Sequence, residues 1–135
     1  MTARSWHTPF YRQYLKSPEW KLFRTEAFRI RGRRCEACGT GWRKRGWFTR
    51  KRWPTVHHVN YERLGSELMC DVRVLCNRDH ANAHQADQSG RFRDLEAATD
   101  HVIKRGKRRQ RTRRVIQERW QRLCLRLSSR NRRLG

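Results

Sequence analysis

The sequence has no long apolar run, and only 36% of its 135 residues are hydrophobic. A helix that spans a bilayer needs about 20 consecutive apolar residues, so we expect no membrane-inserted segment and no membrane partner. The chain also shows no signal-peptide pattern and no lipidation motif. We therefore expect an intracellular protein, cytoplasmic or nucleoid-associated, that is not secreted.

Acidic residues are scarce, with 12 Asp and Glu against 34 Lys and Arg and a formal net charge of +22 at pH 7. Such an excess opposes compact folding by self-repulsion unless a polyanion screens it. Nucleic acid suits this role, because each phosphate that Lys or Arg neutralises releases condensed counterions. We expect double-stranded DNA as the first partner. Because a domain of this size reads little sequence alone, a targeting protein or guide complex is a second candidate.

Apolar residues are too few for a large core, so the fold is expected to need a staple. The chain has five cysteines. Without export signals, these cysteines favour metal ligation over a disulfide framework. Because five is odd, at least one cysteine lies outside any closed set of four.

Helix-start signals lie near the N-terminus, where Thr8 and Ser17 each precede a proline. A hydroxyl N-cap followed by proline at the first helical position is typical of a helix N-terminus. After the second signal, apolar residues recur at helical spacing and predict a helix over 18–31 with Gly32 as its C-cap. Strand composition follows at 55–60 and 71–76, and predicts a hairpin. A further helix is expected to begin at residue 77 or 78.

The last third of the chain is arginine-rich. A helix is expected after residue 90 and is predicted to fade at 104–106, in the segment Lys104-Arg105-Gly106. Beyond it, apolar residues at helical spacing form one narrow stripe, which we expect to pack on the domain while the arginines contact nucleic acid. The stripe comprises Ile116, Trp120, Leu123 and Leu127. The expected contacts are Arg108, Arg109, Arg111, Arg113 and Arg114.

A second basic segment, 41–54, interleaves six basic residues with three tryptophans and one phenylalanine. It lacks periodicity, and we interpret it as a loop or an irregular hairpin arm. Basic and aromatic side chains together suit phosphate contacts and base stacking. In the structural alternative, the tryptophans close a small core and the charges face water. The residues expected to bind nucleic acid are Arg43, Lys44, Arg45, Arg50, Lys51 and Arg52.

The segment 35-CEAC-38 has the spacing of half a structural zinc site, because two thiolates two residues apart can reach one tetrahedral ion. Cys76 and Asp79 share this spacing and predict the other half, with a carboxylate replacing the fourth thiolate. Cys70 and a water molecule are rival fourth ligands. Buried thiols that bind no metal are the structural alternative.

Four of the six histidines lie in two short segments, 56-VHHVN-60 and 79-DHANAH-84. His80 and His84 share one face of the expected helix and can grip one ion. His57 and His58 are neighbours on a strand, so they point to opposite sides and only one can join that ion. We expect a second metal site here, with the remaining histidine left for proton transfer or packing. Structural or solvated histidines are the alternative.

Taken in order, these motifs resemble the HNH endonuclease family. The matching segments are 35-CEAC-38, 56-VHHV-59, 71-DVRVLC-76 and 79-DHANAH-84, within a resemblance that spans about residues 17–85. The resemblance implies an α+β fold: a small ββα-metal (His-Me finger) core stapled by zinc, flanked by N-terminal helices and a basic C-terminal helix. It divides the chain into a helical lead-in at 1–34, a nuclease core at 35–90 and an arginine-rich helical tail at 91–135.

The resemblance also implies roles for single residues. His57, His80 and His84 match the metal ligands of the active site, and His58 matches the general base. Asp71 falls where the family has an asparagine that ties the loop between the strands to the backbone. Asp79 falls where the family has the last cysteine of the zinc knuckle, which completes the expected set Cys35, Cys38, Cys76 and Asp79.

The expected function is that of a metal-dependent endonuclease that hydrolyses phosphodiester bonds of DNA, by cleavage or nicking. Its expected cofactors are one active-site divalent metal (Mg²⁺, Mn²⁺, Ni²⁺ or Zn²⁺) and one structural Zn²⁺. The rival function is a non-catalytic, zinc-stapled nucleic-acid-binding module within a larger nucleoprotein assembly. Such a module would need the charge but would not need a base beside a three-ligand site.

Overall fold

Two capped helices open the part of the chain that the structure, a computed structural model, describes: residues 8–41 and 54–131, with side chains through 124. The Thr8 hydroxyl accepts a hydrogen bond from the Tyr11 N–H at 3.2 Å, and the Ser17 hydroxyl accepts one from the Trp20 N–H at 3.1 Å. The elements are α1 (Pro9–Tyr14), α2 (Pro18–Arg31), β1 (Pro54–His58), a 3-10 turn η2 (Met69–Asp71), β2 (Val72–Cys76), α3 (Asn77–Gln88) and α4 (Leu95–Asn131).

The predicted helix over 18–31 is confirmed by α2, and so is its C-cap, because Gly32 has a φ of 79° that favours glycine. The predicted strands and the helix start at residue 77 are also confirmed, with β1 ending two residues early. Arg43, Lys44, Arg45, Arg50, Lys51 and Arg52, expected to bind nucleic acid, lie outside the described residues.

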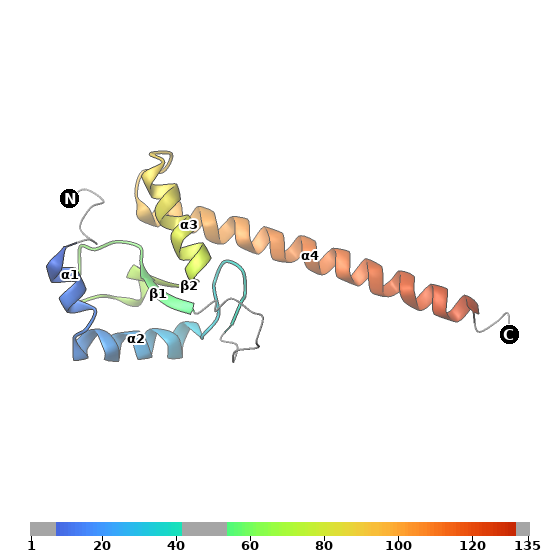
Figure 1. Cartoon of the computed structure of the whole chain (residues 1–135), viewed down its shortest axis with the longest axis horizontal. Helices are drawn as coiled ribbons and strands as arrows, with labels where there is room; N and C mark the ends of the chain where they lie inside the picture. The colour runs from blue at the N-terminus through green and yellow to red at the C-terminus, as the bar shows by residue number, and fades with distance from the viewer. Residues whose placement is uncertain (1–7, 42–53, 132–135) are drawn as a thin grey trace.

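The two strands form an antiparallel hairpin that lies between α2 and α3 (Figure 1). Val56 pairs with Val74, and both pack toward α2 in a core with Trp20, Ala27 and Phe28. Residues one position along face the other way, as alternation along a strand requires. Leu75 therefore belongs to a second core on the α3 side. The result is a small α+β fold in which adjacent residues of β1 face different helices.

The last helix, α4, contradicts the prediction that helical structure fades at 104–106, because it continues without a break to Asn131. Gly106 does not end the helix; it allows the helix to touch the turn that carries the first two cysteines. A Cβ at Gly106 would lie 2.4 Å from the carbonyl oxygen of Ala37. The contact requires a glycine at this position. Gly106 therefore serves a contact between distant segments, and the sequence prediction wrongly took it as the end of a helix.

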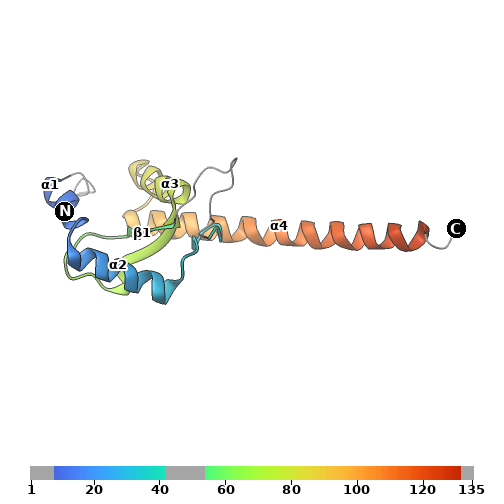
Figure 2. The ribbon, with the colours of Figure 1, turned by 60° about the horizontal axis from the view of Figure 1, so that its bottom comes forward.

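The second half of α4 extends away from the rest of the molecule (Figures 1 and 2). Ile116, Trp120 and Leu123 are 50%, 65% and 50% exposed. The prediction that this stripe packs on the domain is therefore wrong for these three residues, and the Leu127 side chain lies outside the described part. Across the residues that the structure describes, no helix combines the length and apolarity needed to cross a bilayer.

Candidate metal centres

The first candidate centre joins Cys35, Cys38, Cys76 and Asp79, whose ligand atoms lie within 4.8 Å of one another. Cys35 and Cys38 come from the turn after α2, whereas Cys76 and Asp79 come from the junction of β2 and α3. Glu36 holds the turn against β2, because its N–H donates to the Val74 carbonyl and its carboxylate accepts from the Val74 N–H, each at 2.8 Å.

The spacing of this group suits a tetrahedral zinc ion. The sulfur atoms of Cys38 and Cys76 lie 3.7 Å apart, and Oδ2 of Asp79 lies 3.2 Å from Cys35 Sγ and 3.4 Å from Cys76 Sγ. Zinc–sulfur bonds of about 2.3 Å and zinc–oxygen bonds of about 2.1 Å would place such atoms about 3.8 Å and 3.6 Å apart around one tetrahedral ion. The donor atoms therefore fit the metal without rearrangement of the backbone.

The electrostatics of this group depend on burial. Burial raises the pKa of the Cys35 and Cys76 thiols. Burial also acts to raise the pKa of Asp79, but hydrogen bonds from the thiols and from Arg78 outweigh it, and the pKa is lowered. A divalent cation among these donors would offset the burial of thiolate charge and stabilise the ligating form.

Asp79, and not Cys70, completes the group. Cys70 is exposed, and its sulfur lies 3.9 Å from an Arg63 guanidinium nitrogen. The second oxygen of Asp79 accepts from Arg78 at 3.2 Å and from Asn82 at 3.4 Å. These contacts orient the carboxylate, as outer contacts orient ligands in known metal sites.

The turn that carries Cys35 and Cys38 rests on α4. Gln110 donates from its side-chain nitrogen to the Ala37 carbonyl at 2.6 Å, one turn beyond the Gly106 contact. These contacts lie beyond residue 90, the predicted end of the core, and the predicted division of the chain remains a prediction. The first half of α4 is part of the wall around the cysteines.

The second candidate centre joins His57 of β1 with His80 and His84 of α3. The three ring centroids lie 4.7 to 4.9 Å apart, and one nitrogen of each ring can face a common point. His57 is buried, whereas His80 and His84 are half-buried. Four-residue spacing on α3 brings the last two rings onto one face, as the sequence predicted.

His57 has one ring nitrogen engaged and one without a partner. Its Nε2 lies 3.0 Å from the hydroxyl of Thr99 on α4, and both side chains are buried. Its Nδ1 is buried and has no hydrogen-bond partner among the described residues. A buried polar atom without a partner is costly, so this nitrogen suits a metal ligand. If Nδ1 bound a metal, Nε2 would carry the ring proton and the Thr99 hydroxyl would accept it.

Burial also favours the neutral imidazoles that metal binding needs. Burial, and secondarily the neighbouring His80 and His84, hold the pKa of His57 well below its usual range. Burial, followed by His84, lowers the pKa of His80 to about 4. Neutral rings keep the lone pairs that ligate a cation. The residues present therefore fit a divalent metal at this group.

His58 does not join the histidine group, because it points to the opposite face of the hairpin. Its ring stacks on Trp20 with centroids 4.7 Å apart. Its Nδ1 lies 3.2 Å from the Tyr11 hydroxyl and its Nε2 lies 3.0 Å from Glu67. Burial lowers the pKa of His58 despite the carboxylate beside it. The expected role of His58 as a general base remains a prediction.

Glu67 connects His58 to the N-terminal helices. Its other oxygen accepts from the Tyr14 hydroxyl at 2.6 Å. Burial acts to raise the pKa of Glu67, but the hydrogen bonds from Tyr14 and His58 outweigh it and the pKa is lowered. Sequence reasoning missed Glu67, Tyr11 and Thr99. Each is a single residue of a common type, and no local pattern marks it.

Asp71 closes the loop between the strands through acceptor contacts alone. It accepts from the Leu68 N–H at 2.8 Å, from the Asn60 amide at 3.2 Å and from Arg63 Nε at 2.9 Å, with a second contact from the same guanidinium. Chiefly because of Arg63, the pKa of Asp71 is lowered to about 2. All of its partners are donors, so a carboxylate serves this position without an amide.

The tail arginines that the sequence selected are all exposed on α4: Arg108, Arg109, Arg111, Arg113 and Arg114. Arg114 pairs with Glu118 at 2.9 Å. Among the described residues no other member of this set has an ion pair. Their exposure leaves them available to an anionic partner.

The fold and the two groups define a small α+β protein with two candidate metal centres that share the start of α3. Comparison with known protein families, with curated proteins and with solved structures found no match to this chain.

Proposed function

We propose that this chain is a metal-dependent endonuclease of the HNH kind, which hydrolyses phosphodiester bonds of DNA and is stapled by a structural zinc. The observation that carries the proposal is the group of His57, His80 and His84, with a buried His57 nitrogen that has no partner among the described residues. The group spans a hairpin and the helix that follows it, in the order that a ββα-metal core requires.

In this proposal His57, His80 and His84 hold one divalent cation, and Cys35, Cys38, Cys76 and Asp79 hold zinc. A cation at the histidines would supply Lewis-acid stabilisation of charge on the scissile phosphate. Three neutral imidazoles add no negative charge, so the centre would attract a phosphate. Imidazole ligands suit Ni²⁺ and Zn²⁺, and Mn²⁺ and Mg²⁺ are the other two cations to test.

His58 is the proposed general base. Glu67 accepts from its Nε2–H and would stabilise the imidazolium that forms, as a carboxylate does in other histidine bases. The Tyr11 hydroxyl lies at the nitrogen that would take the proton, so the proposal requires Tyr11 to release Nδ1 to water. Catalytic contacts often tighten only when substrate binds, so this arrangement is compatible with the role.

The test is relaxation of supercoiled plasmid by the purified chain with Mg²⁺, Mn²⁺, Ni²⁺ or Zn²⁺. We expect wild type to nick with at least one cation, His80→Ala to lose nicking, and Gln88→Ala to retain it. Gln88 is an exposed α3 residue outside both groups, so it is a matched control. Absence of nicking by wild type with every cation would overturn the proposal.

The base assignment has its own pair of variants. We expect His58→Ala to lose nicking and Tyr11→Phe to keep it, because Tyr11→Phe removes only the hydroxyl that lies at Nδ1. A His58→Ala chain that nicks normally would remove His58 from the reaction. Thermal unfolding of both variants checks that the fold is retained, since His58 also packs on Trp20.

A second candidate function is a non-catalytic nucleic-acid-binding module. The observation that favours it is the position of His58, which is buried with both ring nitrogens engaged. Such a module would bind DNA and hold zinc while failing the plasmid test under all four cations.

A further inference from the structure

A groove between α3 and α4 lies on the other side of α3 from the histidine group. It has a volume of about 750 Å³. Its α3 wall includes Arg78 and Asn82, whereas His80 and His84 each lie two positions further along the helix. At 3.6 residues per turn, two positions are about 200° around the axis. The groove and the histidine group therefore occupy opposite faces of one helix.

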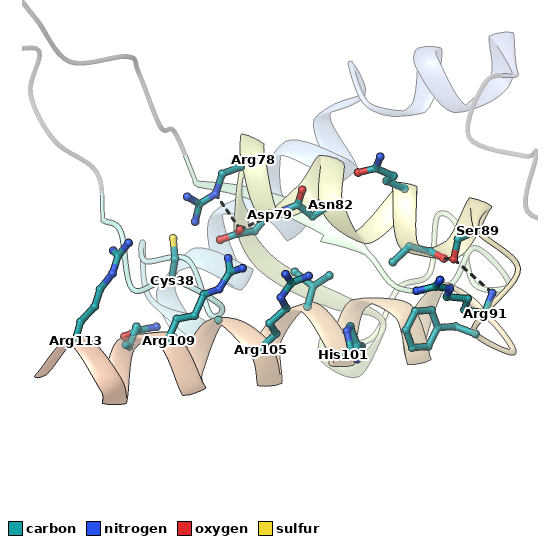
Figure 3. A pocket seen from close by; sticks show the side chains of 16 residues that line it. Cys38, Arg78, Asp79, Asn82, Ser89, Arg91, His101, Arg105, Arg109 and Arg113 are labelled. Atoms are coloured by element: carbon teal, nitrogen blue, oxygen red, sulfur yellow. Dashed lines mark hydrogen bonds and ion pairs between the residues drawn. The ribbon is translucent and has the colours of Figure 1, made fainter. Parts of the chain in front are cut away.

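The opposite wall of the groove is a row of arginines on α4. Arg105, Arg109 and Arg113 follow one another at intervals of four residues and so share one helix face. Figure 3 shows all three rising from the same side of α4, with Arg78 opposite them on α3. Arg91, from the turn between the helices, adds a fifth guanidinium to the lining.

These charges are not balanced within the groove. Among the described residues that line it, the one acidic residue is Asp79, which already accepts from Arg78 and belongs to the cysteine group. Arg105, Arg109 and Arg113 have no ion pair among the residues that the structure describes. Like charges four residues apart on a helix repel, so a polyanion in the groove would remove an unfavourable interaction.

The lining favours a phosphate backbone over a protein segment. Its apolar members are few, and the Phe92 ring is already packed on His101 with centroids 4.9 Å apart. The groove thus offers little to bury the side chains of a peptide. A rise of about 1.5 Å per residue places successive arginines of the row about 6 Å apart, which suits a linear polyanion. Guanidinium groups also bind phosphate oxygens in a bidentate manner.

We propose that this groove binds the phosphodiester backbone of duplex DNA, as a site separate from the histidine group. The inference rests on the proposed function for its choice of DNA, and it adds the surface that holds the duplex. It requires no cation at His57, His80 and His84. A chain that binds through the groove but never nicks would therefore refute the endonuclease and leave the groove standing.

The experiment measures binding of a fluorescein-labelled 20-bp duplex by anisotropy across a range of KCl concentrations. The full zinc-loaded chain is used without added divalent cation. The groove variant is Arg105→Gln/Arg109→Gln/Arg113→Gln. The matched control, Lys107→Gln/Arg119→Gln/Arg122→Gln, removes the same charge from exposed positions on the same helix outside the groove. The single variant His80→Ala is also measured, to show that binding survives loss of the histidine group.

We expect the groove variant to reduce the slope of log K against log salt by about 3, because each lost phosphate contact removes about 0.9. Its affinity should fall at least tenfold more than that of the control. Equal losses in the two variants would overturn the proposal, because they would show diffuse charge instead of a site. A polyglutamate peptide that binds as tightly, through the same three arginines, would also overturn it.

A single variant keeps the test decisive if the triple variant loses zinc or unfolds. Arg113→Gln lies furthest along the row from the Ala37 contact and is exposed. It should reduce the salt slope by about 1, whereas Arg122→Gln should leave it unchanged. An Arg113→Gln chain with the slope of wild type would count against the groove.

Discussion

The cysteine group and the histidine group are built on the same short stretch of chain, yet they differ in closure. Cys76 and Asp79 contribute to the first, and His80 and His84 to the second. The cysteine group has four ligand atoms, the number that a tetrahedral ion binds. The second has three donors and one nitrogen without a partner among the described residues. A closed set suits a structural ion, whereas an open set leaves a coordination position for water or substrate.

The difference teaches that a single helix start can divide its residues between two candidate metal groups. Neighbouring positions on α3 face different ways, so Asp79 turns to the cysteines while His80 turns to β1. Changes to one group should therefore be separable from changes to the other. Four variants test this separation, in order of expected effect.

The largest effect is expected from Cys35→Ser. Structural zinc contributes about 10–16 kcal/mol of apparent binding free energy, which is comparable to the whole stability of a small domain. The variant should lose bound zinc and its cooperative thermal transition. Elemental analysis and circular dichroism measure both. Cys124→Ser is the control, because Cys124 is exposed and outside both groups. A Cys35→Ser chain that keeps zinc would refute the structural site.

Gly106→Ala should come next. Alanine normally stabilises a helix interior relative to glycine by about 1 kcal/mol. Here the added Cβ would lie 2.4 Å from the Ala37 oxygen, so the sign should reverse. We expect a loss of about 2 kcal/mol in the free energy of unfolding, typical of overpacking, with faster zinc release to a chelator.

The measurements for Gly106→Ala are urea unfolding and a chelator competition. Gln110→Ala removes the hydrogen bond to the same carbonyl without adding an atom, so it should cost less than Gly106→Ala. A Gly106→Ala chain more stable than wild type would show that the cysteine turn does not rest on α4.

Thr99→Val tests the histidine group alone. Valine keeps the shape but removes the hydroxyl 3.0 Å from His57 Nε2. Loss of such an outer contact typically costs 10–100-fold in metal affinity or activity, so we expect about this loss in Mn²⁺-dependent nicking. Thr99→Ser should restore the contact and the activity.

Zinc content distinguishes the two groups in this experiment. It should be unchanged in Thr99→Val, because the hydrogen bond of the Thr99 side chain goes to His57 of the histidine group. Equal zinc loss in Thr99→Val and Gly106→Ala would mean that α4 supports both groups as one unit and that they cannot be separated.

The smallest effect is expected from Asp71→Asn. Asp71 belongs to neither candidate metal group, and its replacement should loosen only the loop between β1 and β2. The pKa of Asp71 is lowered from 3.8 to about 2, so its charge stabilises the fold above pH 3.8 and this contribution is lost as pH falls toward 2. With a discount for the half-exposed Arg63 partner, the contribution is about 1–2 kcal/mol.

Urea unfolding of wild type and Asp71→Asn, run side by side from pH 2 to 5, measures this contribution as a difference. Acid effects on the cysteines are common to both chains and cancel. The variant should be less stable at pH 5, and the two curves should converge as pH approaches 2. Parallel curves would show that Asp71 does not stabilise the loop through its charge.

The sequence was sufficient for features that depend on near neighbours. The caps at Thr8 and Ser17, the range of α2 and the close pairs within each candidate metal group follow from spacings of a few residues. Short spacings determine which side chains share a turn or a helix face, whatever the rest of the fold does.

The sequence was insufficient where a contact joins distant segments. Thr99 meets His57 across 42 positions, and Gln110 meets Ala37 across 73. Gly106 was misread for the same reason, since its helix-breaking tendency was outweighed by a tertiary contact that no local pattern announces. The exposed stripe at Ile116, Trp120 and Leu123 shows the converse, because helical periodicity identified a face but not what covers it.

Thr99 and Gln110 lie on one uninterrupted helix, eleven residues or about 16 Å apart along its axis. Thr99 contacts the histidine group and Gln110 contacts the turn of the cysteine group. The helix α4 is therefore held at two points, and its second half extends beyond both. Force applied to that second half, by a bound duplex or by an assembly partner, would act as torque on both points at once. Such a torque would change the angle between the two candidate metal groups.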